Sequence, residues 1–347
     1  MGMVRLLLTI GWLMLGASLA VAATPQELWD RASEGDVAAQ HQLGLHHLDK
    51  TTTDFDTNAA RYWLDKAAQG GSAQAATELG LLILDSRINE AETALAISHL
   101  SHGVAAGLAR AQYHMATIQA KGLLGLAADP EQGRRLMRLS AAQGFAPAQT
   151  ALAVFYYQGI GGEQSVAEAE ELFRVAAEAG EPLAQYHMAV LYLSGHYGAP
   201  DEASADTWLD RAVKQALPQA LLMRGRLDLG QAKSPQAGRS AVAMIERAAG
   251  FGLADAQLVL GRIRAIGKVG QADPAAAVKW YWLAAEQGHP DAQYYLAEHL
   301  LAGKGAPQDI EGALDWLHHA AAQGQPQAIA RLDQLNRQAQ TQQSGKE

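Results

Sequence analysis

The sequence predicts an all-α protein, an α/α solenoid of about eight 36-residue repeats, and two periodic residues together with the composition indicate this. An alanine recurs nine times, each step being 36 residues except one of 37, at Ala39, Ala75, Ala111, Ala148, Ala184, Ala220, Ala256, Ala292 and Ala328. Four residues before each alanine stands a glycine, except at Ala216. Such a fixed period is typical of a stacked repeat array. Alanine and leucine dominate and aromatic residues make up 6% of the chain, which favours helices over sheets.

Residues 1–23 differ from the repeats and are interpreted as a signal peptide. Arg5 provides a positive start, residues 6–19 are mostly apolar, and the small residues at 20–23 are typical of a cleavage site. The alternative is an uncleaved membrane anchor, because the apolar run is near the lower limit for crossing a bilayer. We expect cleavage and export, with a periplasmic or secreted location and no stable membrane insertion after cleavage.

Composition excludes several classes of protein. The chain has no cysteine, so disulfides, thiolate metal sites and a cysteine-linked lipid anchor are excluded. Its formal net charge is −9 and its pI is near 5.7. A general nucleic-acid binder needs a basic face, so we expect no nucleic-acid partner.

Each repeat is predicted to contain two helices, and residues 290–324 illustrate this. Pro290 favours a helix start, and apolar residues at every fourth position of 292–300 share one face. The glycine-rich segment 303–307 then breaks the chain. A second apolar face spans residues 313–321, and Gly324 is suited to end that helix in a left-handed turn.

The two ends of the predicted array differ from its complete units. Residues 24–34 are expected to form a leading helix, and residues 326–338 a C-terminal capping helix with a polar outer face. The solenoid therefore extends over residues 24–338. The glutamine-rich residues 339–347 are expected to form a disordered tail.

The unit quoted above resembles the Sel1-like repeat, a relative of the tetratricopeptide repeat. The resemblance is carried by residues 292–297, 303–305, 313–317 and 320–324, and the anchors extend it over about residues 24–335. It implies a right-handed α/α solenoid. It also implies an adaptor for protein–protein interaction, a class whose bacterial members are in many cases exported.

Catalytic and cofactor motifs are absent from the sequence. No Gly-x-Ser-x-Gly, Ser-x-x-Lys or His-Glu-x-x-His pattern is present, and the glycines of the loop-like segment 261–268 belong to the repeat columns. The close histidine pairs, such as His99 with His102, have no third ligand fixed nearby, so packing explains them better than zinc. We therefore expect no enzymatic activity, catalytic residue, metal or cofactor.

Two groups of residues are candidates for partner binding because the repeat logic does not explain them. If the first helix of each unit lines the concave groove, as the resemblance implies, aromatic and histidine side chains face that groove. They are Tyr113, His114, Tyr186, His187 and Tyr295. The alternative is that several of them pack against the first helix of the neighbouring unit.

The second group is a local basic patch in an acidic protein, formed by Arg224, Arg226, Arg262 and Arg264. Such a patch could anchor carboxylates of a partner. The alternative is a solvated face balanced by Asp228, four residues from Arg224. Arg224 occupies a column that holds leucine in other units, where a charge must be paired or must extend to solvent.

These observations favour an exported, monomeric adaptor that binds a protein partner in its concave groove. A role in regulating an envelope signalling or assembly system would fit such an adaptor. One alternative is a cell-wall hydrolase or polysaccharide-binding envelope protein, although a hydrolase needs two carboxylates at a defined separation. Another alternative is a secreted factor that binds a host protein.

Overall fold

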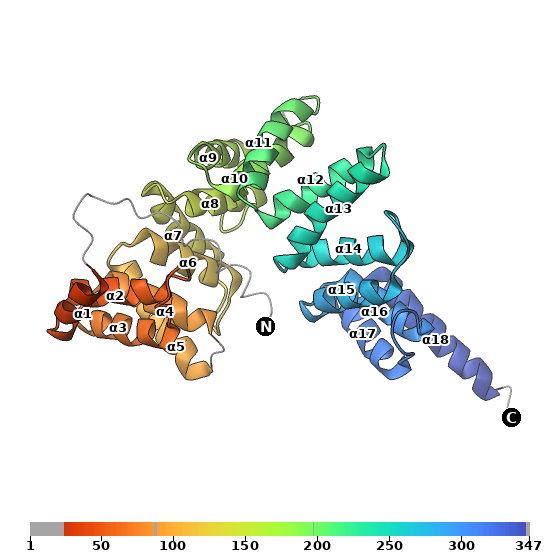
Figure 1. The fold of residues 1–347 in the computed structure, drawn as a ribbon, viewed down its shortest axis with the longest axis horizontal. Coiled ribbons are helices and arrows are strands. Elements are labelled where there is room, and N and C mark those ends of the chain that lie inside the picture. Colours follow the sequence, from red (N-terminus) through yellow and green to blue (C-terminus); the bar gives the residue numbers. More distant parts are fainter. Residues whose placement is uncertain (1–23, 87–88, 197, 345–347) are drawn as a thin grey trace. The chain divides into compact units, whose positions relative to one another are not determined.

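The computed structural model describes residues 24–86, 89–196 and 198–344, which form eighteen α-helices and no strand (Figure 1). The helices are α1 (Pro25–Ser33), α2 (Val37–Leu48), α3 (Thr57–Gln69), α4 (Ala73–Asp85), α5 (Glu90–Ala105), α6 (Ala109–Lys121), α7 (Pro130–Ala142), α8 (Ala146–Gln158), α9 (Val166–Glu178), α10 (Pro182–Leu193), α11 (Glu202–Lys214), α12 (Pro218–Gln231), α13 (Pro235–Gly250), α14 (Ala254–Ile266), α15 (Pro274–Glu286), α16 (Pro290–Ala302), α17 (Ile310–Ala322) and α18 (Pro326–Ser344).

Two kinds of helix alternate along the chain. The even-numbered helices, here called A helices, each contain one of the nine periodic alanines, and the odd-numbered helices, called B helices, lie between them. Consecutive helices pack against one another from α1 to α9 and from α11 to α18. The described residues thus form eight A–B pairs between a leading B helix and a final A helix, which confirms the predicted α/α repeat fold.

The chain divides into two compact units, whose described parts are residues 24–188 and 189–344. They are called the N-terminal unit and the C-terminal unit. The division falls inside α10 (Figure 1), whereas the repeat pattern predicted one continuous solenoid over residues 24–338.

Small residues set the spacing between the helices. All nine periodic alanines are fully buried. A second small column includes Gly225 and Gly261, where an added Cβ would lie 2.6 Å from the side chain of Ile245 and 2.6 Å from that of Tyr281, respectively. Contacts this short require something to move, so the close approach of neighbouring helices depends on these glycines.

The turn from each B helix to the next A helix uses a left-handed residue, as the periodic glycines predict. These glycines have φ values between +74° at Gly107 and +96° at Gly35. At the sixth turn Ala216 has φ +57°. An alanine therefore occupies a conformation that glycine adopts at lower energy.

The C-terminal helix is longer than predicted. α18 extends to Ser344, so residues 339–344 are helical where a disordered tail was expected. The reason is local: Gln and Ala are good helix formers, and no glycine or proline interrupts residues 327–344. The predicted signal peptide, residues 1–23, lies outside the described residues. Among the helices that the structure describes, none combines the length and apolar character needed to cross a membrane.

Candidate functional site

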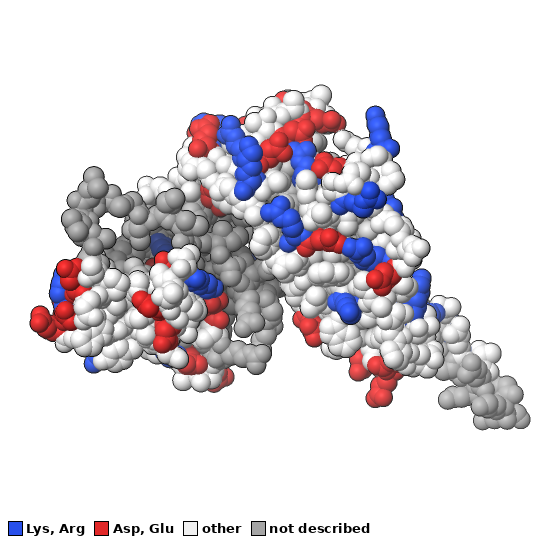
Figure 2. Space-filling model, viewed as in Figure 1, with Lys and Arg blue, Asp and Glu red and all other residues white. Residues whose placement is uncertain are grey.

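Two exposed arginines on consecutive A helices of the C-terminal unit form the centre of the candidate site. Arg226 lies on α12 and Arg262 on α14, 36 residues apart, and both are exposed. Neither forms an ion pair with a carboxylate of the described residues. Figure 2 shows Lys and Arg side chains interspersed with Asp and Glu over this unit. Within the described part of the chain, Arg226 and Arg262 are thus cations without a carboxylate partner.

A stack of aromatic rings lies beside Arg262. The guanidinium lies 5.6 Å from the ring centroid of Tyr295 on α16, within range for a cation–π interaction. The Tyr295 ring stacks on Tyr281 of α15, with centroids 5.5 Å apart, and Tyr281 is buried against Gly261. Burial raises the pKa of Tyr281, so its phenol is neutral at physiological pH. The structure therefore brings two predicted site residues, Arg262 and Tyr295, together, and the Tyr295 ring stacks on a buried side chain.

Arg226 lies near the start of α14. A hydrogen bond from His289, with a separation of 3.0 Å, lowers the pKa of Asp255, and the positive charge of Arg226 lowers it further. In turn, the hydrogen bond to Asp255 raises the pKa of His289. Arg226 thus faces a carboxylate that is already bonded to another residue, which leaves the guanidinium available to an outside carboxylate.

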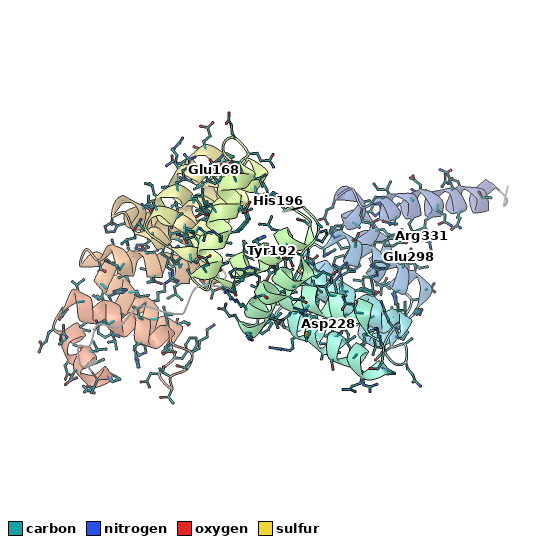
Figure 3. All side chains as sticks on the ribbon, turned by 90° about the horizontal axis from the view of Figure 1, so that it is seen from above. Glu168, Tyr192, His196, Asp228, Glu298 and Arg331 are labelled. Atoms are coloured by element: carbon teal, nitrogen blue, oxygen red, sulfur yellow. The ribbon has the colours of Figure 1, made fainter. Side chains whose placement is uncertain are left out.

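The next residue of the same column carries a negative charge and is paired. Glu298 on α16 accepts a hydrogen bond from Nε of Arg331 on α18 at 2.8 Å, and Figure 3 shows the two side chains next to one another. Arg331 also donates to Gln334 at 2.9 Å. The basic part of the column therefore ends at Arg262.

Arg224 is placed differently from Arg226. Its side chain is only 15% exposed, and its guanidinium nitrogens lie 2.8 Å from Asp206 and 2.9 Å from Asp210, both on α11, and 3.9 Å from Asp228. Burial raises the pKa of Asp228, and the charge of Arg224 opposes that rise. Asp228 balances the charge of Arg224, as the sequence suggested, and Asp206 and Asp210 contribute as well. Arg224 thus lies in the contact between α11 and α12.

Arg264, the fourth arginine of the predicted patch, is also paired within the unit. It donates from Nη2 to Glu246 on α13. The structure therefore separates the patch into two pairs of residues. Arg226 and Arg262 are exposed without ion pairs, whereas Arg224 and Arg264 hold a B helix against the following A helix.

In the N-terminal unit, each predicted tyrosine contacts the histidine next to it. The ring centroids of Tyr113 and His114 on α6 are 4.9 Å apart, and Tyr113 also meets Phe145 edge to face at 5.6 Å. On α10, Tyr186 and His187 are 5.4 Å apart, and His187 stacks on Phe173 of α9 at 4.6 Å. All four side chains are partly exposed.

Both histidines are held neutral by their surroundings. Burial, followed by the nearby charge of Arg110, lowers the pKa of His114 to about 3, and burial alone lowers the pKa of His187 to about 4. The stacking of His187 on Phe173 supports the packing interpretation for that residue. Neither imidazole is placed to provide a positive charge at neutral pH.

Sequence reasoning missed a second arginine cluster in the N-terminal unit. The guanidinium carbon of Arg134 on α7 lies 4.2 Å from the ring centroid of Tyr156 on α8. Nε and Nη2 of Arg138 both donate to the Tyr156 hydroxyl, at 3.1 and 2.8 Å. The available signal was the pair of columns: Arg134 and Arg138 stand ten and six residues before Gly144, and no other repeat has arginine at both positions.

Metal ligands are not clustered in the part of the chain that the structure describes. There, no group of three or more His, Asp or Glu side chains could hold a metal ion. The histidines of the candidate site hydrogen-bond or stack on protein groups instead.

Comparisons with known proteins agree with the repeat fold. The model of the Sel1 repeat matches residues 37–72, 109–145, 146–181, 182–217, 254–289 and 290–325. The repeat containing Arg224, residues 218–253, lies outside these matches. No curated protein matches the chain.

Two solved structures illustrate the similarity. A protective antigen present in uropathogenic Escherichia coli strains is 26% identical, with a TM-score of 0.51 over 90% of this chain and 67% of that one. A Sel1 repeat protein from Oxalobacter formigenes is 24% identical, with a TM-score of 0.57 over 93% of this chain and 98% of that one. Proteins with such repeats are generally non-catalytic scaffolds for protein–protein interaction. Since the family model matches more than half of its residues, the chain belongs to the Sel1 repeat family.

Proposed function

We propose that the protein is an exported adaptor that binds a protein partner through its C-terminal unit. The binding surface is the one formed by the A helices α12, α14 and α16, here called the A-helix face. The observation that carries this proposal is the pair Arg226 and Arg262, exposed on consecutive A helices without ion pairs to the described residues, with Arg262 lying against the Tyr295–Tyr281 stack. Arginine and tyrosine are enriched among the residues that dominate binding energy at interfaces.

The chemistry of this face favours an acidic peptide segment as the part of the partner that is bound. A guanidinium binds a carboxylate through two parallel N–H···O bonds, so each of the two arginines can bind one carboxylate of the segment. The partly exposed Tyr295 ring adds an amphipathic surface beside them. The remaining charge of the protein is acidic, which disfavours non-specific capture of acidic partners.

Export is the second part of the proposal, and it rests on the sequence of residues 1–23. The similarity to a protective antigen supports it, because an antigen that protects must be accessible to the immune system. Of the two exported locations, we favour the periplasm over secretion into the medium. Osmotic-shock fractionation of cells producing the full chain tests it: release with the periplasmic fraction is expected, and retention with the cytosol would contradict export.

Partner binding is tested by cross-linking in intact cells, followed by identification of the captured protein and titration with the purified partner. The double substitution Arg226→Glu/Arg262→Glu should weaken binding at least ~100-fold, since opposing charges replace two charge-assisted contacts. The helical circular dichroism should stay unchanged.

The matched control reverses two exposed charges on B helices of the same unit, Arg239→Glu/Lys279→Glu. It changes the net charge by the same amount, so it should retain binding if the A-helix face is the contact. Equal losses of affinity in both double variants would show that net charge, and not the A-helix face, determines binding. Full binding by Arg226→Glu/Arg262→Glu at low salt would overturn the proposed site.

A further inference from the structure

A polar cavity of about 570 Å³ lies in the N-terminal unit, far along the sequence from the arginines of the C-terminal unit. It is lined by α7, the C-terminal part of α8, the loop 161–165 and the first turn of α9. The loop packs closely against α7: an added Cβ at Gly161 would lie 2.0 Å from the carbonyl oxygen of Pro130. A tight loop on a helix gives the cavity a fixed wall.

Arg134 lines this cavity and is only partly satisfied. It is 6% exposed, and its Nη2 donates to the backbone oxygen of Glu163 at 2.9 Å. Its Nε–H is buried and has no acceptor. A guanidinium has five N–H donors, and leaving one of them buried and unsatisfied costs stability. An acceptor that draws this guanidinium towards itself would recover part of that cost.

Arg138 lies one turn further along α7 and is exposed. The edge of its guanidinium that carries Nε and Nη2 is the edge that typically binds a carboxylate through two bonds. Here both nitrogens donate to the single hydroxyl oxygen of Tyr156, a weaker, neutral acceptor. Neither Arg134 nor Arg138 forms an ion pair with any described carboxylate. Two arginines on one helix of an acidic protein thus lack the charged partner that they would normally have.

The charges around the cavity restrict what can enter it. Three arginines line it, of which Arg135 lies 3.8 Å from Glu131. Two exposed glutamates, Glu163 and Glu168, stand near its edge, and Glu168 is labelled in Figure 3. The formal charges of the lining cancel, so a doubly charged anion would be repelled by the glutamates more strongly than a singly charged one. The lining therefore favours a carboxylate over phosphate or sulfate.

We propose that this cavity binds a single carboxylate group, held by Arg134 and Arg138 beside the ring of Tyr156. The group could belong to a small organic acid or to the carboxyl terminus of a peptide, since the two share this chemistry. On binding, the carboxylate replaces the Tyr156 hydroxyl as acceptor for Arg138. The site is separate from the A-helix face of the C-terminal unit and does not depend on it.

Isothermal titration of the full-length protein with three probes, and with inorganic phosphate as a comparison anion, tests the proposal. The probes are acetate, N-acetyl-Gly-Gly-Ala with a free carboxyl terminus, and the same peptide as its C-terminal amide. Acetate and the peptide acid should both bind saturably, and the peptide amide should bind at least tenfold more weakly than the peptide acid. Equal affinity for acetate and the peptide acid identifies a small-acid site, whereas tighter binding of the peptide identifies a carboxyl-terminus site.

The substitution Arg138→Gln should weaken carboxylate binding at least tenfold, because it removes an exposed guanidinium while leaving the fold intact. Its matched control is Arg174→Gln on α9. Arg174 also stands six residues before a turn glycine, but it is paired with Glu171 and Glu178 at 2.6 and 2.9 Å, so its loss should leave binding unchanged. The proposal is overturned if no carboxylate binds saturably, if phosphate binds as tightly as the acids, or if both variants weaken binding equally.

Discussion

The contact between α7 and α8 and the contact between α11 and α12 use the same positions of the repeat with opposite charges. Ten and six residues before the turn stand Arg134 and Arg138 in the first contact, and Asp206 and Asp210 in the second. In each case these side chains reach the following A helix, where they meet Tyr156 or Arg224. The backbone geometry recurs, while the chemistry at these positions differs.

The difference lies in what satisfies the charges. At the α11–α12 contact, one arginine is surrounded by three aspartates of the same chain, so the charges stabilise folding. At the α7–α8 contact, two arginines share one tyrosine and have no carboxylate of the described residues. The same two positions of the repeat can therefore form a structural ion cluster at one contact and a binding site at another.

The largest expected effect is on the α11–α12 contact. Arg224→Met removes the only cation among Asp206, Asp210 and Asp228 and leaves three carboxylates to repel one another. We expect a loss of about 2–3 kcal/mol in the free energy of unfolding, less than the ~3–5 kcal/mol for breaking a buried pair, since Asp206 and Asp210 are exposed. Urea denaturation followed by circular dichroism measures this loss.

The control for that prediction neutralises the aspartates as well. In the background Asp206→Asn/Asp210→Asn, the further change Arg224→Met should cost about 1 kcal/mol or less, because little repulsion remains. An equal cost in both backgrounds would show that packing of the arginine stem, and not its charge, stabilises the contact.

Acidification should affect the N-terminal unit, which contains the α7–α8 contact, more than the C-terminal unit. The folded-state pKa values of His114, about 3, and His187, about 4, lie below the ordinary value of 6.5. Between those values the unfolded chain binds more protons, so stability falls as pH drops below 6.5. By contrast, His289 of the C-terminal unit has a raised pKa, so its contribution is retained on acidification and lost as pH rises.

From pH 7 to pH 5, we expect these two histidines to cost the N-terminal unit about 2 kcal/mol, after a discount for solvent at the partly exposed rings. The pKa values of Glu78 and Glu181, which burial raises, offset part of this loss. Hydrogen exchange resolved by peptide measures the two units separately in one experiment. His114→Gln/His187→Gln should flatten the pH dependence of the N-terminal unit. A loss confined to the C-terminal unit would contradict the assignment.

A smaller effect is expected at the turn that leads from α11 to α12. Ala216→Gly should raise the free energy of unfolding by about 1 kcal/mol, because glycine tolerates the left-handed conformation that alanine adopts there. The matched change is Gly180→Ala, at the turn before α10, where an added Cβ has open space but φ is +95°. It should cost a similar amount. Effects of the same sign in both variants would contradict a backbone origin.

The sequence predicted the features that repeat and missed those that depend on contacts between helices. The periodic alanines and glycines predicted the helix pairs, the buried columns and the left-handed turns, because each follows from a spacing along one chain. The leucine column also marked Arg224 as a charge that needs pairing. Its main partners, Asp206 and Asp210, lie on the preceding helix and follow no motif.

The candidate sites show the same limit. Arg226 and Arg262 were predictable as exposed because their column lies outside the core columns, and Tyr295 because it lies one residue before the leucine column. Arg134 and Arg138 were not predicted, since their two columns hold no constant residue type: the later repeats have Glu170, Asp206 and Val242 in the first column and Arg174, Asp210 and Glu246 in the second. Only the side-chain contacts between α7 and α8 showed that both arginines interact with the same tyrosine.

The most direct test of this contrast is the free energy of unfolding of the natural protein, Arg138→Gln and Arg224→Met, measured in matched sodium acetate and sodium chloride. In chloride, Arg224→Met should be destabilised and Arg138→Gln should stay within about 0.5 kcal/mol of the natural protein. Acetate should stabilise the natural protein and Arg224→Met through binding, and should not stabilise Arg138→Gln. Equal stabilisation of all three by acetate, or equal destabilisation of the two variants in chloride, would contradict the account.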